Sequence, residues 1–312
     1  MKRYLYIVLF SVLLLSCERE LRYAGDQAEP VLVLEAQPQA GSKSLVCYIN
    51  RSRFFLDNNK TDSASMSKVS VALTTSSGAC SVVKDSVAGL MHHLQLSAPL
   101  PAGDTLHLTV SHPDFPTIEA EEYIVPACMP AVKSLKRDST GYYHLTMRLP
   151  DYPYKNGRIG INGVLYTTFT NILPDTTISR QYILPIMKSK DQIFAPLNSF
   201  SLLYESYKAY ADTGERLFFY SDYATDTHMH LSFDCPADRE KSSFHLDSIV
   251  LSLEARSATY TTYYASLRSY MNQNSDGSGM SVEEPVSVYT NITNGYGVLA
   301  SKTNSKIIIK FK

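Results

Sequence analysis

Two histidines stand at alternate positions of a segment that has the alternating pattern of a β-strand. His228 and His230 flank Met229, so a strand directs both imidazoles to the same face. Imidazole and carboxylate groups are zinc ligands, and several aspartates lie nearby in the sequence. The other interpretation is a solvent-facing strand whose apolar residues point inward, and the alternation favours it. We therefore expect no cofactor, and keep a metal site at His228 and His230 as the weaker alternative.

Other residue patterns that carry catalysis are missing from the sequence. There is no Gly-x-Ser-x-Gly elbow for a serine nucleophile, and no glycine-rich phosphate loop that precedes a lysine. The 29 basic residues are interspersed among 30 acidic ones, with a formal net charge of −1. Nucleic-acid binding would need a basic stripe. We expect a protein that is not an enzyme and does not bind nucleic acid.

The N-terminus contains a cysteine in a setting for lipid attachment. A basic pair and an apolar run precede the sequence Leu14-Leu15-Ser16-Cys17. The run is shorter than the roughly 18 residues that cross a bilayer, which predicts a cleaved signal peptide over residues 1–16. The ending resembles a bacterial lipobox, in which the thioether of Cys17 carries a diacylglycerol. An ordinary secretory signal that ends near a cysteine is the alternative.

Four further cysteines raise the question of disulfides. They are Cys47, Cys80, Cys128 and Cys235. An exported chain meets an oxidising compartment, so two disulfides are possible, in three pairings. A bond between Cys47 and Cys80 is favoured, because both lie on predicted strands of the same domain. The alternative is buried free thiols, which behave as small hydrophobic residues.

One serine lies in an acceptor pattern for glycosylation. Asp62-Ser63-Ala64 resembles the Asp-Ser/Thr-apolar motif of O-glycosylated exported proteins of the Bacteroidota, and it lies in the polar stretch 57–68. That stretch is predicted to be a surface loop. We therefore name Ser63 as a candidate O-glycosylation site.

A tyrosine stripe marks the single helix that the pattern predicts. Tyr260, Tyr263 and Tyr264 recur at helical spacing, which places the helix near residues 257–272. Tyrosine offers an apolar face with a polar tip, so the three rings are a candidate binding surface. The more common role of such a stripe is packing against a sheet.

The remaining sequence is a series of short β segments. Residues 17–29 are polar and aperiodic and predict a flexible tether. Residues 30–126 hold seven short segments with alternating patterns, which is typical of an immunoglobulin or fibronectin-like sandwich. Prolines at 126 and 130 predict a domain boundary. Residues 127–312 predict a larger β-rich domain with the one helix, including a hairpin that turns at Asn162-Gly163. The fold class is mainly β.

Four segments of the C-terminal third resemble one known family. They are Tyr220-Ser221-Asp222-Tyr223, residues 253–267 with the tyrosine stripe, residues 284–292 with Pro-Val and Asn-Ile, and Asn294-Gly295-Tyr296-Gly297-Val298. In this order they are similar to a lipoprotein family of the Bacteroidota known as domain of unknown function 4249. Together with the lipobox and the opening strand, the resemblance spans nearly the whole mature chain.

The resemblance implies a function by association. Such proteins are often encoded beside TonB-dependent outer-membrane transporters. We therefore expect an outer-membrane lipoprotein, held to the membrane by its N-terminal lipid, that acts as a non-catalytic binding or accessory module in nutrient capture. Acidic residues after Cys17 favour display at the cell surface over the periplasm. The alternatives are a metal-dependent hydrolase of the envelope and a cell-surface structural or adhesion protein.

Overall fold

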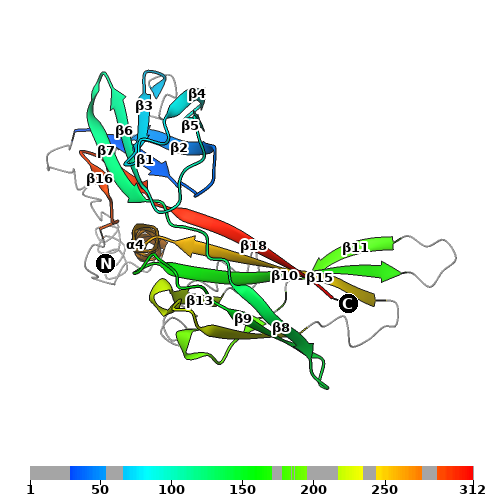
Figure 1. Ribbon diagram of the computed structural model, residues 1–312. Coiled ribbons are helices and arrows are strands. Elements are labelled where there is room, and N and C mark those ends of the chain that lie inside the picture. Colours follow the sequence, from blue (N-terminus) through cyan, green and yellow to red (C-terminus); the bar gives the residue numbers. More distant parts are fainter. Residues whose placement is uncertain are drawn as a thin grey trace, which may run out of the picture.

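The computed structural model places its described residues in two stacked β-sandwiches (Figure 1). The described residues are 29–53, 66–170, 178–183, 185, 187–194, 217–234, 244–275 and 287–311. They form four sheets and one α-helix, α4 (Ala258–Ser275). No helix among them combines the length and the hydropathy needed to cross a bilayer. The chain is mainly β, as the alternation predicts.

The first sandwich packs two sheets face to face. The β1 sheet has the order β17 (Tyr296–Leu299), β1 (Leu32–Ala36), β2 (Ser44–Arg51), β5 (Met91–Leu96), β4 (Val82–Ala88). The β6 sheet has the order β16 (Ile292–Thr293), β7 (Phe115–Tyr123), β6 (Thr105–His112), β3 (Ser70–Thr75). Alternate residues point inward, as Leu45, Cys47 and Ile49 do on β2. Period-two burial therefore builds this core.

Strands β1 to β7 have the strand order of a constant-type immunoglobulin sandwich. One sheet contains β1-β2-β5-β4 and the other β7-β6-β3, which corresponds to strands ABED facing strands GFC. The chain has no tryptophan, and Cys47 on β2 is a free thiol. The sandwich therefore lacks the tryptophan and inter-sheet disulfide of antibody domains, and apolar packing between the sheets replaces them.

Two C-terminal strands complete the first sandwich. β17 pairs in parallel with β1, and β16 pairs antiparallel with β7. Asn294, at φ 59°, turns the chain between them. Residues 292–299 thus belong to the sheets of the first sandwich, whereas the expected boundary at residue 126 assigned them to the second domain. Local alternation carries no information about pairing between strands so distant in sequence.

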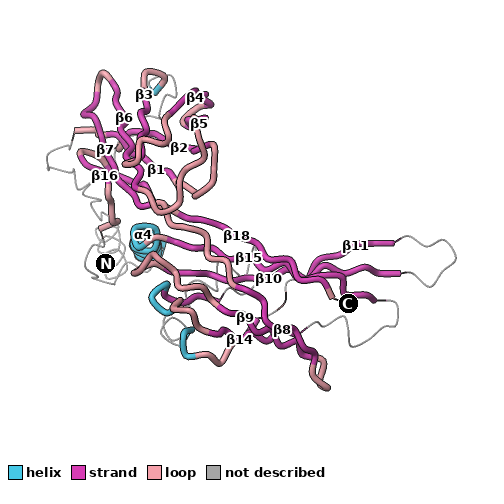
Figure 2. The backbone as a smooth tube through the Cα atoms, in the orientation of Figure 1, coloured by secondary structure: helices cyan, strands magenta, loops and turns pink. Residues whose placement is uncertain are grey.

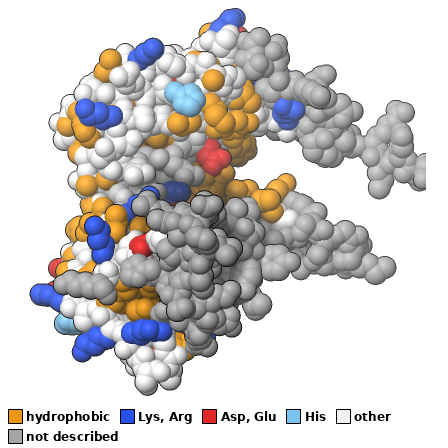
Figure 3. Space-filling model, turned by 90° about the vertical axis from the view of Figure 1, so that its right-hand side faces the viewer, with side chains coloured by type: hydrophobic (Ala, Val, Ile, Leu, Met, Phe, Trp, Pro, Cys, Tyr) orange, Lys and Arg blue, Asp and Glu red, His pale blue; other side chains and the backbone are white. Residues whose placement is uncertain are grey.

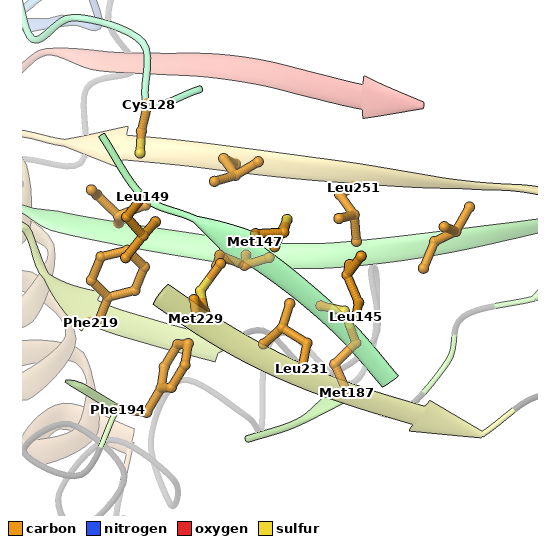
Figure 4. Close-up of a cluster of buried hydrophobic side chains, with 14 of the residues drawn as sticks. Cys128, Leu145, Met147, Leu149, Met187, Phe194, Phe219, Met229, Leu231 and Leu251 are labelled. Carbon is orange, nitrogen blue, oxygen red and sulfur yellow. The ribbon is translucent and has the colours of Figure 1, made fainter. Parts of the chain in front are cut away.

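The second sandwich is larger. Its β9 sheet contains β12 (Met187–Lys188), β14 (His228–Asp234), β9 (Tyr142–Arg148) and β8 (Ala131–Arg137). Its β10 sheet contains β11 (Ile178–Ile183), β13 (Leu217–Tyr220), β10 (Arg158–Thr170), β15 (Phe244–Arg256) and β18 (Lys302–Lys310). Met147, Met229 and Leu231 of the β9 sheet point toward Leu251 of the β10 sheet (Figure 4). Short 3-10 turns, η2 (Gln192–Phe194) and η3 (Ser221–Tyr223), flank this core.

The expected hairpin at Asn162-Gly163 is wrong. β10 runs straight through the dipeptide, and β15 pairs with it there through Ser252 and Leu251. A Cβ atom at Gly163 would lie 3.2 Å from Sδ of Met187, so the absent side chain lets Met187 pack close to the strand. Continuous pairing with β15 overrides the local turn preference of Asn-Gly.

A buried polar seam joins the two sandwiches. Ser301, Thr303 and Ser305 are buried at alternate positions where the chain leaves β17 and enters β18. The Oγ of Ser301 accepts from the Val125 N–H at 3.0 Å, and Thr303 donates to the Val125 carbonyl at 2.7 Å. Ser305 donates to the Cys128 carbonyl at 2.6 Å. These bonds fix β18 to the connection between β7 and β8, so the two sandwiches meet in a defined geometry.

Helix α4 lies at the same junction, where Figure 2 shows it almost end-on between the sandwiches. The Oγ of Ser257 accepts from the N–H of Tyr260 at 3.0 Å and caps the N-terminus. Tyr263 is buried against Val298 and Ala300. The helix therefore follows directly from the end of β15 and packs on β17.

Candidate binding surface

The structure places His228 and His230 on the exposed side of β14. Met229, Leu231 and Phe233 are buried, as the alternation predicts. The Nδ1 of His230 lies 3.3 Å from Oδ1 of Asp191, and the backbone N–H of His230 donates to the same carboxylate. Among the residues that the structure describes, no group of three His, Cys, Asp or Glu side chains is placed to hold a metal ion. The histidine pair thus has an ion-pair partner but no third ligand.

One cluster has the residue types of a nucleophilic triad. Cys47 on β2 stands opposite His92 on β5, and Nδ1 of His92 lies 2.7 Å from Oδ2 of Asp85. Sequence reasoning missed it because the three residues come from three strands. Burial, and secondarily the charge of Asp85, raise the pKa of the Cys47 thiol to about 12. The thiol stays protonated and has no exposed surface. The cluster is therefore part of the core and not a reaction centre.

The expected disulfide between Cys47 and Cys80 is absent from the structure. Both side chains are buried free thiols. The Sγ of Cys80 donates to the Ala98 carbonyl at 3.2 Å, while Cys47 packs in the apolar core of the first sandwich. Each thiol fills space as a small hydrophobic side chain, as the alternative interpretation holds. Cys17, Cys235 and Ser63, together with the signal peptide and most of the tether, lie outside the described residues.

The tyrosine stripe packs partly against the first sandwich. Tyr263 is only 8% exposed. The ring of Tyr260 contacts the cations of Arg256 and Lys302 at 5.2 and 5.6 Å. The Tyr264 hydroxyl donates to Oε1 of Glu35 at 2.7 Å. Docking of α4 on β17 therefore buries Tyr263, whereas Tyr260 and Tyr264 are partly exposed. A binding role of the three tyrosines stays a prediction.

The segments that carry the family resemblance have structural roles. Ser221 is buried, and its Oγ accepts from the N–H of Gly157 at 3.0 Å, which holds the turn before β10. Asn291 joins the two ends of the β16–β17 segment, because its Oδ1 accepts from the Leu299 N–H and its Nδ2 donates to the Leu299 carbonyl. Gly297, at φ 106°, lies directly against the backbone of Leu34. These contacts stabilise turns and close strand packing within each sandwich.

A surface cleft lies on the outer face of the β1 sheet. Its volume is about 510 Å³, and it is lined by Glu35, Ala36, Gln37, Gln39, Ser42, Ser44, Leu45, Val46, Tyr48 and Met91. α4 bounds one side, where Tyr264 accepts from the Gln37 amide at 2.5 Å and donates to Glu35. Glu35 is the one charged residue of the lining. The cleft is therefore nearly neutral.

Exposed apolar side chains line this cleft, and another lies on β17 of the same sheet. Val46, Met91 and Tyr296 are 45%, 48% and 58% exposed, although they lie on strands of a folded sheet. Tyr48 stands opposite both Glu35 and Met91 in the strand register, so these side chains share the outer face. Figure 3 shows hydrophobic side chains gathered in the first sandwich, above the hollow that separates it from the second. We call Val46, Tyr48, Met91 and Tyr296 the apolar strip.

The apolar strip was not predicted from the sequence. Each member is an outward residue of an alternating strand, a position that alternation predicts to be polar. An apolar residue at an outward position is the signal that could have found it, once the register of the strands is known. Val46, Tyr48 and Met91 line one cleft, and exposed apolar side chains gathered in this way are typical of interaction sites.

Comparison with known proteins agrees with the resemblance. The sequence profile of the family described as domain of unknown function (DUF4249) matches residues 18–308. No curated protein sequence matches the chain. The match covers both sandwiches, the helix and strands β16 and β17, and includes all four segments that carry the resemblance. The chain therefore belongs to the DUF4249 family.

Proposed function

We propose that the protein is a lipid-anchored, non-catalytic accessory module that docks on a TonB-dependent transporter of the outer membrane and assists nutrient capture. The observation that supports this proposal is the apolar strip, which joins a nearly neutral cleft on the outer face of the β1 sheet. An enzymatic function has no such support among the described residues. The buried Cys47 thiol is protonated, and the His230 side chain lies beside one carboxylate, that of Asp191.

The position of the strip in the chain favours a membrane partner. Glu29 is the first described residue, and β1 begins at Leu32. A tether from Cys17 to Glu29 spans at most about 40 Å when fully extended. A lipid on Cys17 therefore keeps β1, and the sheet whose outer face carries the strip, within reach of a protein embedded in the same membrane.

The chemistry of the strip limits the partner surface. Glu35 is the one charged group of the cleft, and Tyr264 binds its carboxylate. A partner gains little from opposite charge here, and gains most by burying Val46, Tyr48 and Met91. We expect association that depends weakly on salt, with an apolar patch on the transporter that is bordered by uncharged hydrogen-bonding groups.

The test is affinity capture of the tagged, full-length lipoprotein from solubilised outer membranes. The wild-type protein is expected to retain a TonB-dependent transporter, and Val46→Glu to reduce the recovery about tenfold or more by placing a charge in the buried interface. Val83→Glu is the matched control, because Val83 is 65% exposed on β4 of the same sandwich and does not line the cleft.

Two outcomes would overturn the proposal. One is recovery of the transporter by Val46→Glu that equals recovery by the wild type. The other is a deletion strain with altered cell attachment and normal nutrient uptake, which is the result that the adhesion alternative predicts. Cys17→Ser separates lipid anchoring from transporter docking, because it removes the lipid and leaves the apolar strip intact.

A further inference from the structure

The outer face of the β10 sheet contains a second, smaller recess whose lining residues, apart from one glycine, are polar in type. It has a volume of about 220 Å³ and is lined by Gly160, Asn162, Ser252, Glu254, Asn304, Ser305 and Lys306. The strand register explains the grouping. Gly160, Glu254 and Asn304 form one row across β10, β15 and β18, and Asn162, Ser252 and Lys306 form the next row.

Two of the residues that line the recess are short. Gly160 has no side chain, and a Cβ atom there would lie 2.6 Å from Cε1 of Phe218, so the Phe218 ring lies against bare backbone. The Arg256 guanidinium covers the same ring at 4.7 Å and pairs with Glu254 at 2.6 Å. Phe218 and Arg256 therefore lie beside the row of Gly160 and Glu254, and Ser252 has the shortest side chain of the next row.

Three polar side chains of the recess have no hydrogen-bond partner among the described residues. The side chains of Asn162, Ser252 and Asn304 make no hydrogen bond to another group in the part of the chain that the structure describes. Each amide offers two donors and an acceptor, and the serine offers one donor and its lone pairs. A ligand that carries several hydroxyl groups can both donate to and accept from such a set.

Charge limits the ligand further. Arg256 and Lys302 both lie beside the Glu254 carboxylate, at 2.6 and 3.8 Å, and neutralise it. Lys306 is then the one cation of the lining without an ion-pair partner in the described structure. One exposed ammonium is too little to hold a phosphate, which protein sites bind with several donors or a helix N-terminus.

An apolar ledge borders the recess. Val164, Val250 and Ile308 form the next row across the same three strands, and Ile308 is 65% exposed. A sugar ring has hydroxyls around its rim and C–H groups on its faces, so it can bond to the amides while one face rests on the ledge. The volume is below the roughly 300–1,000 Å³ of drug-sized pockets, which limits the occupant to a single ring.

We propose that this recess binds one ring of a neutral carbohydrate, with Asn162, Ser252 and Asn304 as hydrogen-bonding residues and the Val164–Val250–Ile308 row as the apolar platform. The recess belongs to the second sandwich and the apolar strip to the first. Sugar binding and transporter docking therefore use separate surfaces, and either can fail without the other.

The test is saturation-transfer NMR and calorimetry on the mature full-length protein in detergent, with glucose, galactose and mannose as neutral probes and glucuronate and inorganic phosphate as charged ones. Saturable binding of at least one neutral sugar in the millimolar range is expected. Asn304→Ala combined with Ser252→Ala is expected to weaken that binding about tenfold through the lost hydrogen bonds. Lys310→Ala is the matched control and should bind as the wild type does. Lys310 lies on β18, two rows beyond the row of Asn162, Ser252 and Lys306.

Three results would overturn the proposal: no saturable binding of any neutral probe, preference for glucuronate or phosphate, or unchanged affinity in the double variant. Thermal unfolding of each variant shows that it is folded, since Asn304 is exposed and its replacement removes no contact of the core. Capture of the transporter by the double variant, measured in parallel, separates this site from the docking surface.

Discussion

The backbone N–H of Ser301 donates to Oε1 of Glu122 at 2.9 Å, across 179 positions of the sequence. Glu122 is almost fully buried at the end of β7, and Ser301 lies where the chain passes from β17 into β18. The Ser301 carbonyl accepts from the N–H of Ser257, which caps α4. One carboxylate thus connects both sandwiches and the helix.

Glu122 makes stability depend on pH. Burial raises the pKa of its carboxyl group above the ordinary 4.5, in spite of hydrogen bonds from Ser257 and Ser301. The folded state therefore binds this proton more tightly than the unfolded state, and the free energy of unfolding falls as the pH rises from 4.5 through the folded pKa. Glu122→Gln should flatten that fall in urea unfolding followed over pH. Glu121→Gln, at an exposed neighbour, should keep it; an unchanged profile in Glu122→Gln would contradict the assignment.

Gly297 should tolerate no side chain. It has φ 106°, and a Cβ atom would collide with the backbone of Leu34 in β1. Gly297→Ala is expected to lower the free energy of unfolding by about 3 kcal/mol or more. Gly89→Ala is the control, since Gly89 also has positive φ but open space around it, and about 1 kcal/mol is expected there. Equal losses in the two variants would exclude the collision as the cause.

The buried thiols should be protected from alkylation. Burial raises the pKa of both Cys47 and Cys128 to about 12, and neither side chain is exposed. Iodoacetamide at neutral pH is expected to leave both residues unmodified in the folded protein and to label both, without a reductant, after denaturation. Mass spectrometry of the peptides measures this. A Cys47 that stays unlabelled after denaturation would reveal a disulfide.

The tyrosines of α4 should contribute to stability unequally. Tyr263→Ala removes a buried ring from contact with Val298 and Ala300 and is expected to cost about 3 kcal/mol. Tyr264→Phe removes the hydrogen bonds to Glu35 and Gln37 and is expected to cost about 1 kcal/mol. Urea unfolding of both variants tests this. A larger loss of unfolding free energy for Tyr264→Phe than for Tyr263→Ala would contradict the conclusion that burial of Tyr263 docks α4.

The histidine pair should hold no stoichiometric metal. His230 lies beside Asp191 but lacks a third ligand among the described residues. Elemental analysis of mildly purified protein is expected to give the same metal content for the wild type and His230→Ala. An ion present at one equivalent and lost in His230→Ala would restore the hydrolase alternative.

Several elements could be predicted because their signal is local. Alternation over residues 228–234 and the tyrosine spacing near residues 257–272 correspond to β14 and α4. A periodicity of two or of 3.6 residues can be recognised within one segment, so it does not require knowledge of the strands that pair with that segment. The hairpin at Asn162-Gly163 failed for the opposite reason: pairing with β15 decided the conformation of that dipeptide.

The candidate sites could not be predicted in this way. In the apolar strip, Tyr48 and Met91 are opposite each other on two strands and Tyr296 lies on a third strand of the same sheet, while the recess joins Asn162 to Ser252 and Asn304 from three other strands. The sequence of one strand shows which residues point inward and which point outward. It does not show the strand register that makes residues of different strands neighbours.

The sequence by itself determined the β class, the helix, the family and the expectation of a lipid on Cys17, because short-range periodicity and ordered motifs encode these features. The tertiary structure decided that residues 292–299 complete the first sandwich, that Cys47 and Cys80 are free thiols, and that Tyr263 of the tyrosine stripe is buried. Each of these depends on which strands pair and in what register, and that choice minimises the free energy of the whole core and not of any one segment.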